Sequence, residues 1–123
     1  MRQNIIRGKR ILLVDDEASV RESFRALLQI DDHTITEAKN GAEALDLFTK
    51  GQFDLVMTDF EMPVMKGNEL AVRIKKLAPK QPILMIIAYG KKLGDSENPV
   101  DSILNKPLTL DELREAIATL LSN

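Results

Sequence analysis

The chain has 123 residues, a length at which a single domain buries its own core without disulfides or a structural metal. The absence of cysteine excludes thiol chemistry and cysteine-ligated metals, and the net charge of -2 gives no overall field that favours nucleic acid or an anionic membrane as a partner. No apolar run approaches the length of a membrane span, so we expect one globular domain over residues 1–123, located in the cytoplasm.

The first residues are basic but lack the apolar core of a signal peptide. We interpret residues 1–9 as an extension in which Arg2, Arg7 and Lys9, with the adjacent Arg10, are solvated. In chain order, the apolar patterns then predict a strand at 11–14, a helix at 18–29, a strand at 33–38, a helix at 41–50, a strand at 53–59, a helix at 68–77, strands at 82–87 and 102–105, and a helix at 110–122.

Continuous apolar strands separated by helices favour a parallel sheet covered on both faces, that is, a doubly wound α/β fold with five strands. The segment 90–99 contains two glycines and an Asn-Pro pair, so a helix there should be short or irregular. Thr109, followed three residues later by Glu112, has the pattern of a capping box at the start of the last helix. The side chains expected to face the core are Val20, Phe24, Leu27 and Leu28 of the first helix, Ala44, Leu45 and Phe48 of the second, and Leu70, Ile74 and Leu77 of the third.

Polar side chains follow three of the predicted strands. Asp15 and Asp16 come directly after the first strand, Asp59 ends the third, and Lys106 follows the fifth. In an open α/β sheet, ligands bind beyond the carboxyl ends of the strands, so we expect these groups to meet at one edge. A lone pair of acids at 15 and 16 also fits a helix N-cap and first turn, which is the structural alternative.

Carboxylates that lie close together repel one another, and a bound cation relieves this repulsion. Two like charges about 4 Å apart cost roughly 4 kcal/mol at an effective dielectric near 20, and a hard divalent cation removes that cost. Oxygen ligands from one or two carboxylates are what Mg²⁺ prefers, so the acids predict a magnesium site. Asp59, on a separate segment, is placed to act as a nucleophile toward phosphorus, with Lys106 neutralising a phosphoryl oxygen.

Three motifs, LLVDDE at 12–17, DLVMTDFEMPVMKG at 54–67 and NKP at 105–107, resemble those of the receiver domains of two-component response regulators. The resemblance covers nearly the whole chain, which is similar to single-domain chemotaxis regulators. It implies the flavodoxin-like strand order 2-1-3-4-5. It also implies that a histidine kinase or phosphotransfer protein donates a phosphoryl group and that an output partner, not identified by the sequence, receives the signal.

Position by position, the resemblance makes Asp59 the phosphoacceptor, Asp15 and Asp16 the acidic pair that holds Mg²⁺, and Lys106 the contact to the phosphoryl group. It further implies a backbone carbonyl ligand from Glu61, whose side chain occupies a position that commonly tunes phosphate lifetime, and a cis peptide before Pro107. Such a domain phosphorylates itself and slowly dephosphorylates itself, and we do not expect a turnover enzyme.

The chain departs from the family pattern at two positions. Receivers usually carry Ser or Thr at the end of the fourth strand, where this chain has Ile87, and Tyr or Phe three residues before the lysine, where it has Ile103. The hydroxyl normally binds the phosphoryl group, and the aromatic ring normally swings inward as the hydroxyl shifts. We therefore expect weak or rerouted signalling, although two isoleucines are also simply good strand formers.

Other functions remain as alternatives. A degenerate receiver would bind a partner without needing phosphate. Ile87 and Ile103 favour this hypothesis, and the intact acids oppose it. The stretch TDFE at 58–61 faintly resembles the nucleophile loop of haloacid-dehalogenase-type phosphatases, which place it after the first strand and carry cap segments absent here. A flavin-binding relative is disfavoured because Asp15, Asp16 and Glu17 would repel a flavin phosphate. For single residues, we interpret His33 as a surface residue and Gly67 as part of a backbone turn.

Overall fold

In the computed structural model, residues 5–91 and 99–122 are described. The strands are β1 (Arg10–Val14), β2 (Thr34–Ala38), β3 (Leu55–Asp59), β4 (Ile83–Ile87) and β5 (Ser102–Asn105). The helices are α1 (Ala18–Gln29), α2 (Gly41–Lys50), α3 (Gly67–Leu77) and α4 (Leu110–Leu121). The predicted helix 18–29, helix 41–50 and strand 102–105 are confirmed at both ends, and the other predicted elements are confirmed within a residue or two.

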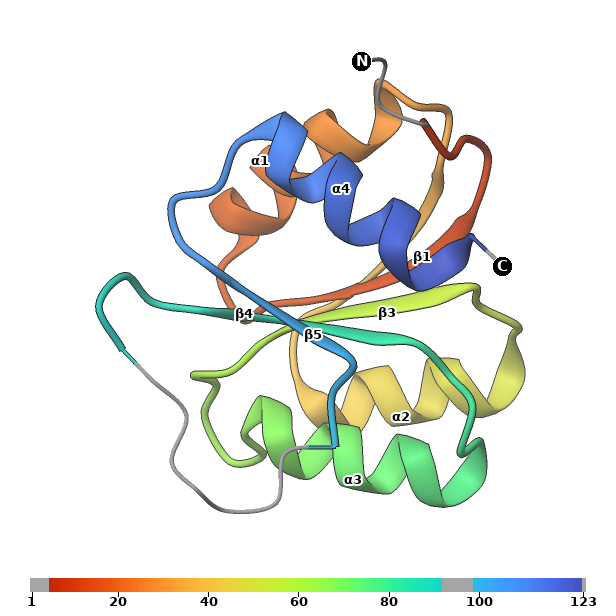
Figure 1. The fold of residues 1–123 in the computed structure, drawn as a ribbon. Coiled ribbons are helices and arrows are strands. Elements are labelled where there is room, and N and C mark those ends of the chain that lie inside the picture. The colour runs from red at the N-terminus through yellow and green to blue at the C-terminus, as the bar shows by residue number, and fades with distance from the viewer. Residues whose placement is uncertain (1–4, 92–98, 123) are drawn as a thin grey trace.

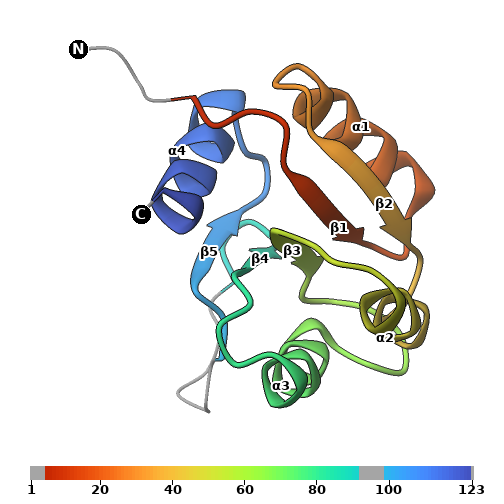
Figure 2. The ribbon, with the colours of Figure 1, turned by 90° about the vertical axis from the view of Figure 1, so that its right-hand side faces the viewer.

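All neighbouring strands run parallel, in the order β2-β1-β3-β4-β5. Helices α1 and α4 cover one face of the sheet and α2 and α3 cover the other (Figure 1). Figure 2, turned by 90°, shows the same sheet between the two pairs of helices. The doubly wound, flavodoxin-like fold and its predicted strand order are therefore confirmed.

The three inner strands, β1, β3 and β4, are mostly apolar and buried because helices cover both faces of the sheet. Successive side chains of a strand point to opposite faces. Ile11 and Leu13 of β1 accordingly pack in the core layer under α1 and α4, with Phe24. Leu12 and Val14 belong to the layer under α2 and α3. Each layer thus buries one face of the sheet.

Most predictions for the helix faces are confirmed, with one exception. Phe24, Leu28, Ala44, Leu70 and Ile74 are buried. The prediction for Leu77 is wrong, because this last residue of α3 is 59% exposed. It lines an open groove between α2 and α3 instead of reaching the sheet. The predicted capping box of α4 is present, with the Thr109 side chain accepting from the Glu112 N–H.

The interpretation of His33 as a surface residue is wrong. Its side chain is 5% exposed, and its Nδ1 accepts a hydrogen bond of 3.0 Å from the backbone N–H of Lys9. The segment before β1 folds over the histidine, with the Gly8 N–H donating to the Asp31 carbonyl and Ile6 packing against the core. Residues 6–9 are thus docked on the domain through their backbone and Ile6, which corrects the prediction of a solvated extension for this part. The side chains of Arg7 and Arg10 are exposed as predicted, and Arg2 lies outside the described residues.

A partly buried ion pair lies at the same end of the molecule. The Asp31 side chain is 4% exposed and accepts two hydrogen bonds of 2.9 Å from the Arg114 guanidinium of α4. Arg7 lies 3.8 Å from the same carboxylate. This pair connects the loop after α1 to the last helix, which stand 83 residues apart in the chain.

Two further observations complete the fold. The short or irregular helix predicted within 90–99 falls on residues 92–98, which lie outside the described part of the chain. Across residues 5–91 and 99–122, none of the helices has the length and apolar character needed to cross a membrane.

Candidate functional site

The predicted polar residues meet at one edge of the sheet. Asp59 is the last residue of β3, Asp15 directly follows β1, and Lys106 directly follows β5. Because the strands are parallel, their carboxyl ends lie along the same edge. Ligand oxygens of Asp15, Asp16 and Asp59 lie within 4.8 Å of one another. The sequence prediction that these carboxylates form one cluster is therefore supported by their geometry.

Lys106 reaches this cluster from the far side. Its Nζ lies 3.3 Å from Asp59 Oδ1 and 3.6 Å from Asp15 Oδ2. Asp15 and Asp59 are buried, at 1% and 7% exposure, whereas Asp16 is exposed. The site is thus a cluster of two buried carboxylates and one exposed carboxylate, with the Lys106 ammonium beside the buried pair.

Burial and like charge make the buried carboxylates reluctant to ionise. Burial, with the negative charge of Asp15 added to it, raises the pKa of Asp59 to about 6, although Lys106 opposes the shift. Burial also raises the pKa of Asp15, and Asp16 and Glu17 add to the shift. Burial lowers the pKa of Lys106, but the carboxylates of Asp59 and Asp15 outweigh it, so its pKa is raised and the ammonium stays charged.

The donor set fits a divalent cation. Asp15 Oδ2 is buried and has no hydrogen-bond partner among the described residues, because 3.6 Å from Lys106 is too long for a hydrogen bond. An orphaned buried oxygen beside two further carboxylates is an arrangement that a hard cation relieves. Asp15, Asp16 and Asp59 are therefore the residues that would hold Mg²⁺.

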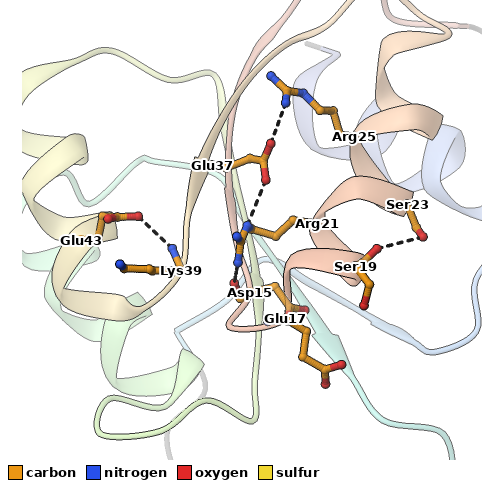
Figure 3. A network of polar contacts seen from close by, with 9 residues as sticks. All are labelled: Asp15, Glu17, Ser19, Arg21, Ser23, Arg25, Glu37, Lys39 and Glu43. Carbon is orange, nitrogen blue, oxygen red and sulfur yellow. Dashed lines mark hydrogen bonds and ion pairs between the residues drawn. The ribbon is translucent and has the colours of Figure 1, made fainter.

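The carboxylate of Asp15 is oriented by its neighbours. Its Oδ1 accepts a hydrogen bond of 2.9 Å from the Glu17 backbone N–H. The backbone carbonyl of Asp15 accepts a hydrogen bond of 2.6 Å from the guanidinium of Arg21 in α1. The same guanidinium donates to Glu37 of β2 at 2.9 Å (Figure 3). Arg25, one turn along α1, donates to the other Glu37 oxygen at 2.8 Å. Glu37 thereby orients Arg21, which in turn binds the backbone of Asp15.

Sequence reasoning missed this support. Arg21 and Arg25 are four residues apart in the sequence, and this spacing places them on one face of a helix. Nothing in the sequence pairs that face with Glu37, because the pairing depends on how α1 lies across β2. The structural alternative, in which Asp15 and Asp16 serve as the N-cap and first-turn acids of α1, is wrong. The N-cap residue of α1 is Glu17, and the first turn of α1 contains no acid.

Gly67 serves close approach and not a turn. It is the first residue of α3, and a Cβ built there would lie 2.3 Å from the carbonyl oxygen of Asp59. The Gly67 N–H donates to the Phe60 carbonyl at 2.9 Å. The interpretation of Gly67 as a turn residue is therefore corrected: its missing side chain lets α3 start against the backbone of the site.

The Glu61 side chain lies outside the carboxylate cluster. Its oxygens stand 3.9 Å from Lys66 Nζ and 3.8 Å from Lys91 Nζ, and the side chain is 46% exposed. The predicted contribution of its backbone carbonyl to a metal stays a prediction. The Lys91 side chain is 62% exposed.

Ile87 and Ile103, predicted to occupy the switch positions, lie on the neighbouring strands β4 and β5, and their role as switch positions stays a prediction. Ile87 is the last residue of β4 and is 5% exposed, and Ile103 is half-buried in β5 opposite Met85. Neither side chain offers a hydrogen-bond donor at the sheet edge. The predicted cis peptide between Lys106 and Pro107 is confirmed.

Comparison with known proteins identifies the class. A family model described as "Response regulator receiver domain" matches residues 11–118, so the chain belongs to the response regulator receiver domain family of two-component signalling. Receiver domains bind Mg²⁺ at an acidic site, and the cluster of aspartates described above fits that property.

Particular relatives agree with this assignment. Response regulator MprA of Mycobacterium sp. (strain KMS) is 34% identical over 115 residues, which cover 91% of this chain and 50% of MprA. The chain thus spans about half the length of the curated relatives it matches. Response regulator TrrA of Thermotoga maritima, solved in complex with Mg(2+)-BeF, is 39% identical with a TM-score of 0.86, covering 92% of this chain and 99% of TrrA. TrrA in complex with the histidine kinase ThkA gives 40% identity and a TM-score of 0.85, covering 93% and 99%.

Proposed function

We propose that this chain is a phosphoacceptor in a two-component phosphorelay, with Asp59 as the phosphorylated residue. The single observation that supports it best is the placement of one buried carboxylate, that of Asp59, between an acidic pair and the Lys106 ammonium at 3.3 Å. The phosphoryl donor in the cell would be a histidine kinase or a phosphotransfer protein. TrrA, which is similar over nearly its whole length, is known in complex with the kinase ThkA.

The residues divide the work of the reaction. An oxygen of the ionised Asp59 carboxylate forms the new bond to phosphorus while the bond from phosphorus to the donor breaks and the donor leaves with the electron pair. Lys106 stays protonated and neutralises charge on the transferring group, which needs positioned positive charge more than covalent chemistry. When bound, Mg²⁺ would supply the remaining charge neutralisation at the acidic pair.

This chemistry is self-phosphorylation followed by slow self-dephosphorylation, and we do not propose a turnover enzyme. The Arg21–Glu37 support fixes the Asp15 loop, so the carboxylate cluster is in place before any ligand arrives. Pre-positioned charges of this kind need no reorganisation during the transfer.

A magnesium-dependent reaction with a small acyl phosphate or phosphoramidate tests the proposal. Intact-mass spectrometry should show the gain of one phosphoryl group on the wild type, and the gain should vanish in Asp59→Asn. Asp46→Asn provides the matched control, because Asp46 is a surface aspartate of α2 paired with Lys50. The control should be phosphorylated as fast as the wild type.

The buried Ile87 favours one competing function, a degenerate receiver that binds its partner without phosphate. No mass gain with any small donor, or a gain that survives in Asp59→Asn, would reject the phosphoacceptor role. In the first case the degenerate receiver would become the better description. In the second case another residue would be the acceptor.

A further inference from the structure

The strand next to β3 ends in an apolar side chain, that of Ile87, at the edge that carries Asp59. A transferring phosphoryl group spreads its charge over three oxygens. Among the described residues, Lys106 is the one cation whose ion pair with Asp59 is seen, and the neighbouring strand ends in Ile87, whose side chain cannot donate a hydrogen bond. A further cation within reach of Asp59 would therefore complete the site.

Lys91 lies on a turn that is fixed at this edge. The turn begins directly after β4, and the Lys91 N–H donates to the Ala88 carbonyl at 3.1 Å. Gly90, with φ of 79°, permits the reversal. The Asn105 amide lies 3.4 Å from the Ala88 carbonyl oxygen and 3.5 Å from that of Lys91. Because Asn105 directly precedes Lys106, these contacts place the backbone of Lys91 beside the segment that carries Lys106.

The Lys91 side chain points toward the loop after Asp59. Its Nζ lies 3.8 Å from one oxygen of Glu61, while Lys66 Nζ lies 3.9 Å from the other oxygen. Exposed ion pairs of this kind contribute about 1 kcal/mol or less, so Lys91 leaves Glu61 at little cost. When Lys91 leaves, Lys66 remains beside Glu61, so the Glu61 carboxylate keeps a cation.

We propose that Lys91 is a catalytic residue of the phosphotransfer, binding the phosphoryl group on Asp59 in the place left without a hydroxyl by Ile87. The proposal rests on the phosphoacceptor function argued above. A phosphoryl group brings a charge of about -1.5 to -2, whereas Glu61 offers a single charge that Lys66 already shares. Lys91 keeps its proton and makes no covalent bond; the bond changes are those at Asp59 and the donor.

Removal of the Lys91 charge tests this role. Lys91→Gln should slow phosphorylation by acetyl phosphate in the presence of Mg²⁺ about tenfold, the effect of losing one charge-assisted hydrogen bond in the transition state. Lys66→Gln is the matched control, because it removes an equal charge from the same carboxylate but from the opposite side. It should change the rate less than about twofold. Affinity for beryllofluoride with Mg²⁺, measured by calorimetry, should fall in the same order.

Rescue separates direct contact from a general loss of charge. Introducing Ile87→Thr into Lys91→Gln should restore much of the rate, because the hydroxyl supplies the missing donor, and Lys91→Arg should retain it. Equal effects of Lys91→Gln and Lys66→Gln, or no effect of Lys91→Gln, would overturn the role of Lys91 while wild-type phosphorylation still supports Asp59. Absence of any mass gain on the wild type would instead reject the phosphoacceptor function and this proposal with it.

Discussion

At the scale of the residue, Asp59 carries a charge that the metal-free fold disfavours. Its pKa is raised to about 6 from 3.8, so between these values the folded chain binds more protons than the unfolded chain. Stability contributed by the protonated carboxyl is fully present below pH 3.8 and is lost as pH rises through about 6. The cost of ionisation is therefore complete at neutral pH.

Asp59→Asn should consequently stabilise the metal-free protein at pH 7 by about 1–3 kcal/mol, since each pKa unit corresponds to about 1.4 kcal/mol. Urea unfolding in the presence of a chelator measures the difference, which should shrink to nearly nothing at pH 4. Asp16→Asn, at an exposed position of the same cluster, should give a smaller gain. A destabilised Asp59→Asn variant at pH 7 would contradict the account of crowded charge.

Gly67 offers a second prediction at this scale. Alanine is the better helix former by about 1 kcal/mol, so propensity alone would make Gly67→Ala stabilising. The added Cβ would lie 2.3 Å from the Asp59 carbonyl oxygen, which is backbone and cannot move aside cheaply. We expect Gly67→Ala to destabilise the fold by about 1–3 kcal/mol in denaturant unfolding.

Gly41→Ala is the informative comparison for this prediction. A Cβ at Gly41 would lie 2.6 Å from the Met65 sulfur, which belongs to a flexible side chain that can shift. Its cost should be clearly smaller than that of Gly67→Ala. Equal costs at the two positions would mean that the backbone contact beside Asp59 is not what requires glycine.

At the scale of the element, the strands and helices could be predicted because their signals are local. The strand 11–14 is a continuous apolar run, and the helix 41–50 is bounded by Asn40, whose side chain accepts from the Glu43 N–H, and by Gly51. The carboxylate cluster could be predicted for the same reason, since Asp15 directly follows one parallel strand and Asp59 ends another. The position after a strand is enough to place such a residue at the ligand-binding edge.

Features that depend on contacts between distant elements could not be predicted. The buried pair of Asp31 and Arg114 needs α4 to lie beside the loop after α1, which no local pattern reports. His33 is buried only because the segment containing Lys9 folds back over it. Leu77 has the spacing of a core residue, but α3 ends there and leaves it in an open groove.

The N-terminal segment provides a prediction at this scale. His33 Nδ1 accepts from the Lys9 N–H, so the neutral ring carries its proton on Nε2, and protonation would set two donors against each other. Burial lowers the pKa of His33 below 6.5; Asp31 and Asp32 oppose the shift, and Lys9 and Arg7 add to it. The unfolded chain therefore binds the proton more readily, and the stability from this contact is complete above pH 6.5 and is lost as pH falls through the lower folded pKa.

Amide hydrogen exchange followed by NMR measures this loss. The Lys9 amide should lose protection as pH falls below 6.5, relative to the intrinsic exchange rate. The Asp15 amide, which donates to the Ala38 carbonyl at 3.1 Å, is the internal control and should stay protected. In His33→Gln the pH dependence of Lys9 should disappear. If Lys9 protection does not change with pH, the histidine does not hold the segment.

The connection between α4 and the loop after α1 also loses stability as pH falls, but in a more acidic range. Hydrogen bonds from Arg114 lower the pKa of Asp31 below 3.8 despite its burial. The stability from this pair is present above the unfolded pKa of about 3.8 and is lost as pH falls through the folded value. Asp31→Asn should lower the urea midpoint at pH 7, and the difference from the wild type should narrow steadily below pH 4. A constant difference across that range would exclude ionic pairing as its source.

At the scale of the whole molecule, the site couples ion binding to folding. Asp15 and Asp16 follow β1 and Asp59 ends β3, so the three carboxylates come together only when the sheet is formed. An unfolded chain would present the same acids far apart and would bind Mg²⁺ weakly. A ligand that binds only the folded chain stabilises it by about 2.7 kcal/mol at 100 times its Kd.

Thermal unfolding should therefore show a Tm that rises with MgCl₂ concentration, while NaCl at matched ionic strength controls for screening of surface charge. The rise should be largest for the wild type and much smaller in Asp15→Asn, which removes the orphaned Oδ2 oxygen that most needs a cation. Because Mg²⁺ relieves the same crowding that Asp59→Asn removes, that variant should start from a higher Tm in chelator and gain less. The Tm values of the two proteins should therefore converge as Mg²⁺ increases, because the wild type starts as the less stable protein and gains more once its site is filled. If both proteins gained equally, the ion would be acting elsewhere on the surface, and the carboxyl ends of β1 and β3 would not form its site.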